Sequence, residues 1–527
     1  MTDAGAGPDA AIQASLNRTA EQYDAVPYTA IPFSRLQPSR LGAVAGLLGM
    51  KAAPAATART LEIGCATGGH IIPLAARCPG AQFVGLDVSA AQIAQANERV
   101  ARLGLKNIEF QARSLTELGP ADGVFDYIVC HGVYSWIPQA VREALMRVVG
   151  ERLSPEGIAV ISFNVLPGWR LFQVVRDSMI LHAGEIDSHE QRSAQTRRLF
   201  DLMEKHGAPD STYGGVWRRE ARRMADLPNF YLAHELFEEN NTPCTFRDFM
   251  KEAGRNGLAY LGETRPLGNI PENSSEGRAA IIRELSGNEL LATEQYIDIV
   301  TGRTFRESLL IHANRAPLVD RSLDDSRLDG LHLLTTATLE VKDAPGGGCT
   351  VRDGDTEIDV NDPFVASRLR AIMARSPASS SLDELAPAGA CTAEQRENLA
   401  SVLMNFVCRG MLDVTSEAVV CQNRAGDRPR VWPLAASDAA ARLDRTATLR
   451  HTLFDLTPFA QFVAPLLDGE HGRAEIVERL AADALAGKTT MRDAKGPVTD
   501  PARVRELCGT MLDRQIEALA AAGLLVG

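Results

Sequence analysis

A strand-like run ends in a glycine-rich loop in the first part of the chain, and this segment carries the clearest chemical signal. Residues 60–69 read Thr-Leu-Glu-Ile-Gly-Cys-Ala-Thr-Gly-Gly, and a helix is expected to begin near His70. Gly64 and Gly68 let the backbone turn sharply and approach a ligand closely. The exposed N–H groups at the start of the helix favour an anionic or polar ligand group. The segment therefore predicts a site for a dinucleotide or for S-adenosylmethionine.

Two residues of the segment distinguish between these cofactors. A dinucleotide site would have glycine at position 66, but the methyl group of Ala66 obstructs the close approach of a pyrophosphate. The carboxylate of Glu62, at the end of the strand, would repel a pyrophosphate and attract the ammonium group of a methionine moiety. We therefore predict S-adenosylmethionine as the cofactor, contacted by Glu62, Gly64, Cys65, Ala66 and Gly68.

Further candidate cofactor contacts follow the next two strands. Asp87 ends the run Gly-Leu-Asp and is followed by Val88. An acidic residue about twenty positions after the glycines can accept hydrogen bonds from both ribose hydroxyls. After the third strand, Ser114 occupies the position where many methyltransferases have an Asp that binds the adenine amino group. We expect the Ser114 hydroxyl or the backbone to make that contact instead.

The residues after the fourth and fifth strands are candidates for the methyl-acceptor side. The fourth strand is followed by His-Gly-Val-Tyr-Ser-Trp-Ile-Pro at 131–138. Because the ends of parallel strands form the ligand crevice, these side chains are expected to face the sulfonium and the acceptor. The candidate catalytic residues are His131, Tyr134, Trp136, Asn164 and Trp169, and His131 is also a candidate cofactor contact.

Each of these residues also has a structural interpretation. Tyr134 and Trp136 could pack the turn after the strand, and His131 could be a hydrogen-bonded structural histidine. In the catalytic interpretation, the aromatic rings desolvate an amine, Asn164 or a backbone carbonyl receives an N–H group, and His131 is the one obvious base nearby.

The elements that position these residues read as a doubly wound α/β fold. Short apolar runs alternate with helical stretches, and this alternation predicts a parallel sheet with helices on both faces, a Rossmann-like class I methyltransferase domain. The expected strands are 60–63, 82–86, 107–110, 127–130 and 158–163.

The chain has 527 residues, which is too long for a single core. Two endings of the type helix, glycine, strand, which finish at Val414 and Val526, predict winged-helix-like units in the last third. The expected parts are a disordered tail at 1–20, a lid and docking helix at 21–58, the S-adenosylmethionine-binding domain at 59–185, a helical middle domain at 186–316, a winged-helix-like domain at 317–430 and a C-terminal helical or winged-helix-like domain at 431–527.

Composition and charge argue against several other classes of protein. The formal net charge of −12 disfavours nucleic-acid binding. His234-Glu235 begins like a zinc-binding helix but lacks the second His, and the nine Cys form no Cys-x-x-Cys pair, so we expect no metal. No apolar run is long enough to span a membrane and the first residues do not form a secretory signal, so a cytoplasmic location is expected.

Four motifs in this order resemble one bacterial family, the methyltransferases that carry a methyltransferase regulatory domain. They are Tyr-Asp-x-x-Pro-Tyr at 23–28, Leu-Glu-Ile-Gly-Cys-Ala-x-Gly-Gly at 61–69, the run at 131–138 and Asn-x-x-Pro-Gly-Trp at 164–169. The segments Tyr231–Glu235, Gly257–Glu263 and Arg303–Leu310 also resemble this family, whereas the last two hundred residues match it only in outline.

The resemblance extends the prediction to a substrate. It implies that Tyr23 and Tyr28 contact the cofactor. The family includes rickettsial protein-lysine methyltransferases that modify outer-membrane proteins, so a protein-lysine acceptor is expected, with a homodimer as a further possibility. Two alternatives stay open at this point: a methyltransferase for a small molecule, and a non-enzymatic regulator that senses S-adenosylmethionine.

Overall fold

The computed structural model describes residues 30–527, apart from 239, 266–275, 323, 490–491 and 494–495, together with Arg18, Glu21 and Asp24. The predicted cofactor contacts Tyr23 and Tyr28 lie outside the described residues, as does the predicted tail at 1–20 except for Arg18.

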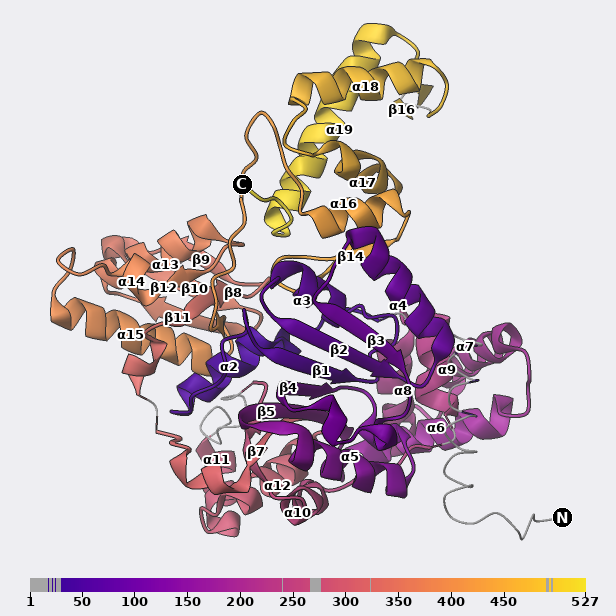
Figure 1. The fold of residues 1–527 in the computed structure, drawn as a ribbon, viewed down its shortest axis with the longest axis vertical. Helices are drawn as coiled ribbons and strands as arrows, with labels where there is room; N and C mark the ends of the chain where they lie inside the picture. The colour runs from indigo at the N-terminus through magenta and orange to yellow at the C-terminus, as the bar shows by residue number, and fades with distance from the viewer. Residues whose placement is uncertain are drawn as a thin grey trace.

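A seven-stranded sheet forms the centre of the molecule, with strand order β3-β2-β1-β4-β5-β7-β6 (Figure 1). Strands β1 to β5 pair in parallel, and β7 runs antiparallel to both of its neighbours. All five strands expected from the sequence are present, and the predicted α/β fold is confirmed. The bounds are β1 Arg59–Ile63, β2 Gln82–Asp87, β3 Ile108–Ala112, β4 Phe125–Cys130, β5 Leu153–Asn164, β6 Leu258–Glu263 and β7 Phe305–His312.

Helices cover both faces of this sheet because the strands carry apolar side chains on both sides. In β4, Tyr127 and Val129 pack against α2, whereas Ile128 and Cys130 pack against the opposite layer. The first layer contains α2 (Pro38–Leu47), α3 (Ile71–Arg77) and α4 (Ala90–Leu103), and the opposite layer contains α5 (Gln139–Arg152) and α10 (Phe246–Arg255).

The docking helix begins earlier than the sequence suggested. Within the predicted lid and docking helix at 21–58, the apolar run at 41–50 predicts the helix itself, but α2 starts at Pro38 and ends at Leu47. Proline suits the first turn of a helix because it has no N–H to leave unpaired. The chain turns at Gly49, whose φ of +72° favours glycine. The predicted docking on the core is found, since Leu41 and Val44 are completely buried on the sheet.

The prediction of a separate helical domain over 186–316 is wrong for its second half. Strands β6 and β7 complete the central sheet, so the methyltransferase core continues to His312 and does not end near residue 185. Their apolar runs are short and buried on both faces, a pattern that periodicity does not distinguish from a buried helix segment. Helices α11 (Glu276–Ser286) and α12 (Leu290–Thr301) lie between these two strands in sequence.

The first half of that region does form a helical cluster. Its helices are α7 (His189–His206), α8 (Thr212–Met224) and α9 (Asn229–Phe237), and they are joined by α6 (Trp169–Ala183), which precedes residue 186. The four helices share one apolar core that includes Trp169 and Trp217. They lie beyond the carboxyl ends of β1, β2 and β3, on the side of the sheet where a cofactor crevice is expected (Figure 1).

Residues after His312 form a smaller α/β unit beside α2. Strand β8 (His332–Thr335) pairs with β12 (Ser380–Ser381) and β13 (Leu412–Thr415), and β9 (Glu340–Asp343), β10 (Cys349–Asp353) and β11 (Thr356–Val360) form a second sheet. Helices α13 (Pro363–Arg375), α14 (Leu382–Leu385) and α15 (Ala393–Cys408) pack with them. The expected helix-glycine-strand ending is found: α15 leads through Gly410, at φ +73°, into β13. Whether this unit is a winged helix stays a prediction.

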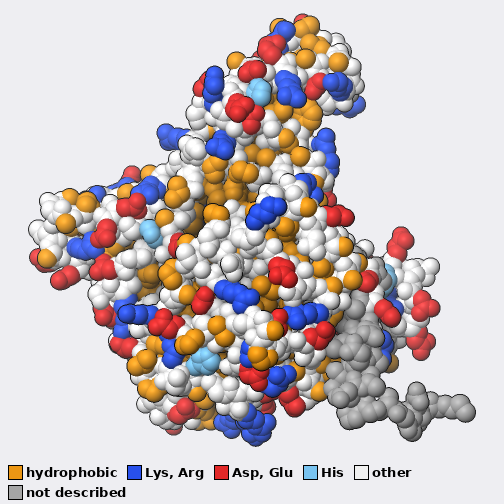
Figure 2. Space-filling model, viewed as in Figure 1, with side chains coloured by type: hydrophobic (Ala, Val, Ile, Leu, Met, Phe, Trp, Pro, Cys, Tyr) orange, Lys and Arg blue, Asp and Glu red, His pale blue; other side chains and the backbone are white. Residues whose placement is uncertain are grey.

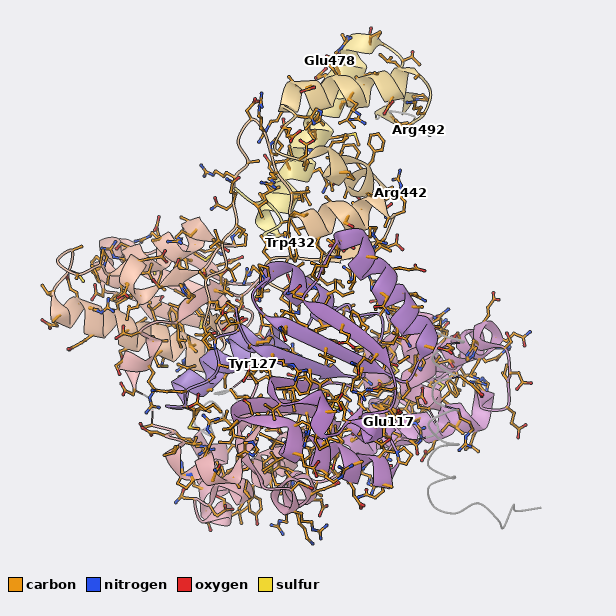
Figure 3. The ribbon with its side chains drawn as sticks, in the orientation of Figure 1. Glu117, Tyr127, Trp432, Arg442, Glu478 and Arg492 are labelled. Carbon is orange, nitrogen blue, oxygen red and sulfur yellow. The ribbon has the colours of Figure 1, made fainter. Side chains whose placement is uncertain are left out.

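The last part of the chain is a helical domain that docks on α3 and α4. Its elements are α16 (Pro433–Ala440), β14 (Arg445–Ala447), β15 (Leu453–Asp455), α17 (Pro458–Val463), α18 (Arg473–Leu485), β16 (Arg492–Asp493), β17 (Gly496–Pro497) and α19 (Pro501–Ala521). Hydrophobic side chains gather where this domain meets the core (Figure 2), and Trp432 lies at this junction (Figure 3). Within the described part of the chain, no helix is both long and apolar enough to cross a membrane.

Candidate active site

Two glycines shape the loop after β1. A side chain at either position would force the neighbouring side chains to move. Gly64 has a φ of +75°, and a Cβ there would lie 2.5 Å from Val133 Cγ2. Gly68 has a φ of +73°, and a Cβ there would lie 2.6 Å from Phe110 Cζ. The N–H groups of Gly64 and Cys65 both donate to the carbonyl of Leu86, at 2.8 and 3.0 Å. The predicted loop is therefore held against the end of β2.

Glu62 lies at the end of β1, next to this loop, as a buried carboxylate with one oxygen unpartnered among the described residues. It is 6% exposed, and its Oε2 atom accepts no hydrogen bond from any residue that the structure describes. Burial, with a contribution from the charge of Asp87, raises the pKa of Glu62 well above its ordinary value. A buried acceptor without a donor is destabilising. The ammonium group of the methionine moiety would satisfy it, so Glu62 fits its predicted role.

Asp87 joins the cofactor loop to the start of α4. Its Oδ2 accepts from the N–H of Ala66 and its Oδ1 from the N–H of Ser89, both at 2.9 Å. Each carboxylate oxygen has a second acceptor position, which the ribose hydroxyls could use. Burial raises the pKa of Asp87, although its backbone hydrogen bonds oppose this shift. Val88 is half-buried beside it.

Two smaller predictions are refined by the structure. Ser114 caps a short 3-10 helix, Leu115–Glu117, and its Oγ accepts from Thr116 N at 3.2 Å and from Thr116 Oγ1 at 2.8 Å. Its hydroxyl can still donate to a ring nitrogen, but both lone pairs are used, so the adenine amino group needs a backbone acceptor. Figure 3 shows Glu117, the last residue of this 3-10 helix, near the carboxyl ends of the strands. Cys65 is a buried thiol whose pKa is raised well above its ordinary value by burial, which makes it an unreactive filler.

Tyr134 does not line the acceptor side, contrary to the catalytic prediction. It is 1% exposed, its hydroxyl donates to Glu252 Oε2 at 2.7 Å, and its ring packs edge-on against Phe163 and Phe249. The short 3-10 helix Tyr134–Trp136 turns this ring toward α10. Its packing interpretation is therefore the correct one.

Trp136, Trp169 and Asn164 gather near the end of β5. The two indole rings meet edge to face, with centroids 6.5 Å apart. Trp169 Nε1 donates to Asn241 Oδ1 at 3.0 Å, and Cys244 N donates to the carbonyl of Asn164 at 3.2 Å. The segment 241–244 therefore lies against the end of β5.

This corner also contains two amide groups with unused donors. Asn164 is 3% exposed, and neither its Nδ2 nor that of Asn241 finds a hydrogen-bond partner in the described ranges of the chain. Unsatisfied buried polar atoms are uncommon, and a ligand is one explanation for them.

His131 is held neutral in a largely apolar setting. Its ring centroid lies 4.3 Å from that of Phe33 and 5.8 Å from that of Phe305. Burial lowers its pKa to about 4, although the carboxylate of Glu307, 3.9 Å from Nδ1, acts in the opposite direction. A group with such a low pKa is a weak base near neutral pH. The histidine thus fits a wall of the site better than a proton acceptor.

Phe33, Arg35 and Glu307 form part of this wall and were not singled out in the sequence. Arg35 donates to both carboxylate oxygens of Glu307 at 2.8 Å, and Thr264 Oγ1 donates to Glu307 Oε2 at 2.7 Å. Burial alone would raise the pKa of Glu307, but the hydrogen bonds from Arg35 outweigh it and hold that pKa low. Glu307 lies in the motif Arg303–Leu310, yet its partner Arg35 is 272 positions away, so no local signal links them.

The fold and the site together define the class of protein. The strand order, the antiparallel β7, the glycine loop after β1 and the acidic residue at the end of β2 are those of a class I methyltransferase that uses S-adenosylmethionine.

Comparison with known families and proteins identifies the family. Three family models match: "Methyltransferase domain" at 60–157, "Predicted methyltransferase regulatory domain" at 228–312 and "PKMT, C-terminal winged helix domain" at 427–524. An uncharacterised protein of Rickettsia prowazekii (strain Madrid E) is 34% identical over 243 residues, which cover 45% of this chain and 96% of that protein. The chain belongs to the class I methyltransferases that carry a methyltransferase regulatory domain, as the sequence motifs predicted.

Two longer matches agree with this assignment. A second uncharacterised protein of the same Rickettsia prowazekii strain is 29% identical over 533 residues, which cover 96% of this chain and 93% of that protein. The solved structure of PKMT2 from Rickettsia typhi matches with a TM-score of 0.83 at 24% identity, covering 95% of this chain and all of that one. PKMT2 has also been solved in complex with AdoHcy. The chain is therefore an S-adenosylmethionine-dependent methyltransferase, and the predicted C-terminal winged helix is confirmed.

Proposed function

We propose that this methyltransferase transfers methyl groups from S-adenosylmethionine to lysine side chains of a protein. The observation that carries the proposal is the pair of indole rings of Trp136 and Trp169, which meet edge to face at the end of β5 beside the buried side chain of Asn164. The family resemblance to rickettsial protein-lysine methyltransferases supports the same acceptor and suggests an outer-membrane protein.

A lysine acceptor must lose its proton before it can react. With a reference pKa of about 10.4, only about one amine in a thousand is neutral at pH 7.4, which costs about 4 kcal/mol. An apolar aromatic surface disfavours the charged form and so reduces this cost. His131 adds no positive charge to oppose the amine, because its pKa of about 4 keeps it neutral.

The chemical step needs alignment more than acid or base catalysis. The amine lone pair attacks the methyl carbon in line with the sulfur, the new C–N bond forms as the C–S bond breaks, and S-adenosylhomocysteine leaves. In this proposal Trp136 and Trp169 flank the lysine stem, the carbonyl oxygen of the Asn164 side chain receives an amine N–H, and Glu62 with Asp87 holds the donor.

A labelled-methyl transfer assay tests the proposal. The purified protein is incubated with S-adenosylmethionine labelled at the methyl group and with outer-membrane and soluble protein fractions. Label should appear in protein and, after acid hydrolysis, in methyl-lysine. Acetylation of the fractions beforehand converts their lysine amines into amides, whose nitrogen is not nucleophilic, and should abolish the signal. Label that resides in low-mass products, or in protein whose lysines are blocked, would contradict the proposal.

A further inference from the structure

The segment just before α2 lies directly on the cofactor loop. A Cβ added to Gly69 would meet the carbonyl oxygen of Ala30 at 2.0 Å, so the two backbones are in close contact. Three residues later, the N–H of Phe33 donates to His70 Nδ1 at 3.3 Å, and the ring of Phe33 packs against His131. The position of this segment therefore shapes both the loop and the wall of the site.

His70 is also contacted by a residue from the far end of the chain. His451 Nε2 lies 2.8 Å from His70 Nδ1, across 381 positions of sequence. The two side chains are 2% and 1% exposed. Because Nδ1 of His70 accepts the N–H of Phe33, it carries no proton itself, so His451 must be the donor. Burial lowers the pKa of both histidines, to about 3 in His70, so both rings are neutral, and Nδ1 of His70 connects two distant segments.

The C-terminal domain holds His451 firmly in this position. The residue lies in the turn between β14 and β15, at a φ of +60°, and its N–H donates to the carbonyl of Thr448. Arg77 at the end of α3 donates to Leu449 O at 2.8 Å, close to this turn. Farther away, Arg99 of α4 makes a bidentate ion pair with the fully buried Asp438, at 3.0 and 2.6 Å. The domain is thus docked on the same layer that carries the cofactor loop.

We propose that His451 is a positioning residue of the cofactor site, supplied by the C-terminal winged-helix domain. Its hydrogen bond orients His70, which holds Phe33 and the segment from Ala30 over the loop that binds S-adenosylmethionine. The domain then contributes to cofactor binding in addition to any part in binding the acceptor. This inference concerns only the binding of the methyl donor, S-adenosylmethionine, and does not depend on which methyl acceptor the enzyme uses.

Two substitutions at one position test the hydrogen bond. His451→Ala removes the donor, whereas His451→Gln keeps an N–H at a similar reach. Ala and Gln must both adopt the positive φ of this position, so any backbone strain is the same in the two variants. Arg102→Ala is the matched control, since Arg102 contacts Ser437 of the same domain at 3.3 Å but leads to no residue of the site. Calorimetry measures the affinity of the full-length variants for S-adenosylhomocysteine, and thermal unfolding reports their stability.

We expect His451→Ala to weaken S-adenosylhomocysteine binding about five- to tenfold, the effect of one hydrogen bond. His451→Gln should recover most of that loss, and Arg102→Ala should bind as the wild type does. Normal affinity in His451→Ala, or an equal loss in the Ala and Gln variants, would overturn the proposal.

A second variant tests the same connection if His451→Ala does not fold. Phe33→Leu leaves both histidines and the domain interface in place, and removes only the ring that the pair holds against His131. It should weaken S-adenosylhomocysteine binding without lowering the unfolding temperature by more than a few degrees. Wild-type affinity in this variant would show that the ring of Phe33 does not carry the position of His70 to the wall of the site, and would refute that step of the proposal.

Discussion

Replacing Glu62 by Gln should weaken cofactor binding and at the same time stabilise the protein without cofactor. The side chain keeps its shape but loses its charge, so the ammonium group of the ligand loses a charge-assisted hydrogen bond. Such a bond contributes about 1.5–3 kcal/mol. At 1.4 kcal/mol for each factor of ten, the dissociation constant for S-adenosylhomocysteine should rise about 10- to 150-fold.

The effect of pH on stability has a definite sign. Burial raises the pKa of Glu62 in the folded protein above its unfolded value of about 4.3. The folded state therefore binds the proton more tightly than the unfolded state. The cofactor-free wild type accordingly loses stability as the pH rises above that unfolded value. Glu62→Gln has no such proton to lose, so its advantage in unfolding temperature should grow from pH 5 toward neutrality.

Calorimetry with S-adenosylhomocysteine and thermal unfolding across this pH range measure the two effects. Glu98→Gln is the matched control: it removes the same charge from an exposed position on α4 and should change neither quantity. If Glu62→Gln binds S-adenosylhomocysteine as tightly as the wild type, Glu62 does not hold the ammonium group. If the two proteins unfold at the same temperatures at every pH, the buried charge is not a source of instability.

Three further predictions concern residues of the segment that follows β4. Tyr134→Phe removes the hydrogen bond to Glu252 and should cost about 1–2 kcal/mol of stability, seen as a lower unfolding temperature with unchanged S-adenosylhomocysteine affinity; reduced affinity would contradict its structural role. Trp136→Ala should lower turnover of a protein acceptor at least tenfold and leave the affinity for S-adenosylhomocysteine within about twofold of the wild type. The reason is that the ring contacts Trp169 and not the cofactor loop. Normal turnover in this variant would exclude Trp136 from the acceptor site. The pH–rate profile of the wild type should show no inflection near 6.5, since the pKa of His131 is about 4, and an inflection there that disappears in His131→Gln would instead identify it as the base.

Local sequence determined the cofactor-binding half of this protein. Gly64 and Gly68 are needed because a side chain would collide with Val133 or Phe110, and Glu62 and Asp87 lie at the ends of adjacent parallel strands. These features depend on a few consecutive residues and on the fixed geometry of a strand, a loop and a helix. The short motif therefore predicted the cofactor, and the alternation of apolar runs with helical stretches predicted the first five strands and the class of fold.

The direction of individual side chains was not determined in the same way. Tyr134 and Trp136 are two positions apart in a run that the sequence marked as one unit, yet Tyr134 enters the core beside Phe249 and Trp136 meets Trp169. A 3-10 helix has three residues per turn, so residues two apart point in different directions. Only the backbone conformation of this turn separated the core residue from the candidate acceptor contact.

Contacts between distant segments were decided by the tertiary structure alone. Strands β6 and β7 joined the sheet although the segment between Trp169 and Leu258 is almost entirely helical. Arg35 pairs with Glu307, which is 272 positions away in sequence, and His70 pairs with His451, which is 381 positions away. Such pairs leave no periodic or local pattern in a single sequence, because each partner is chosen by the packing of whole domains and not by its neighbours along the chain.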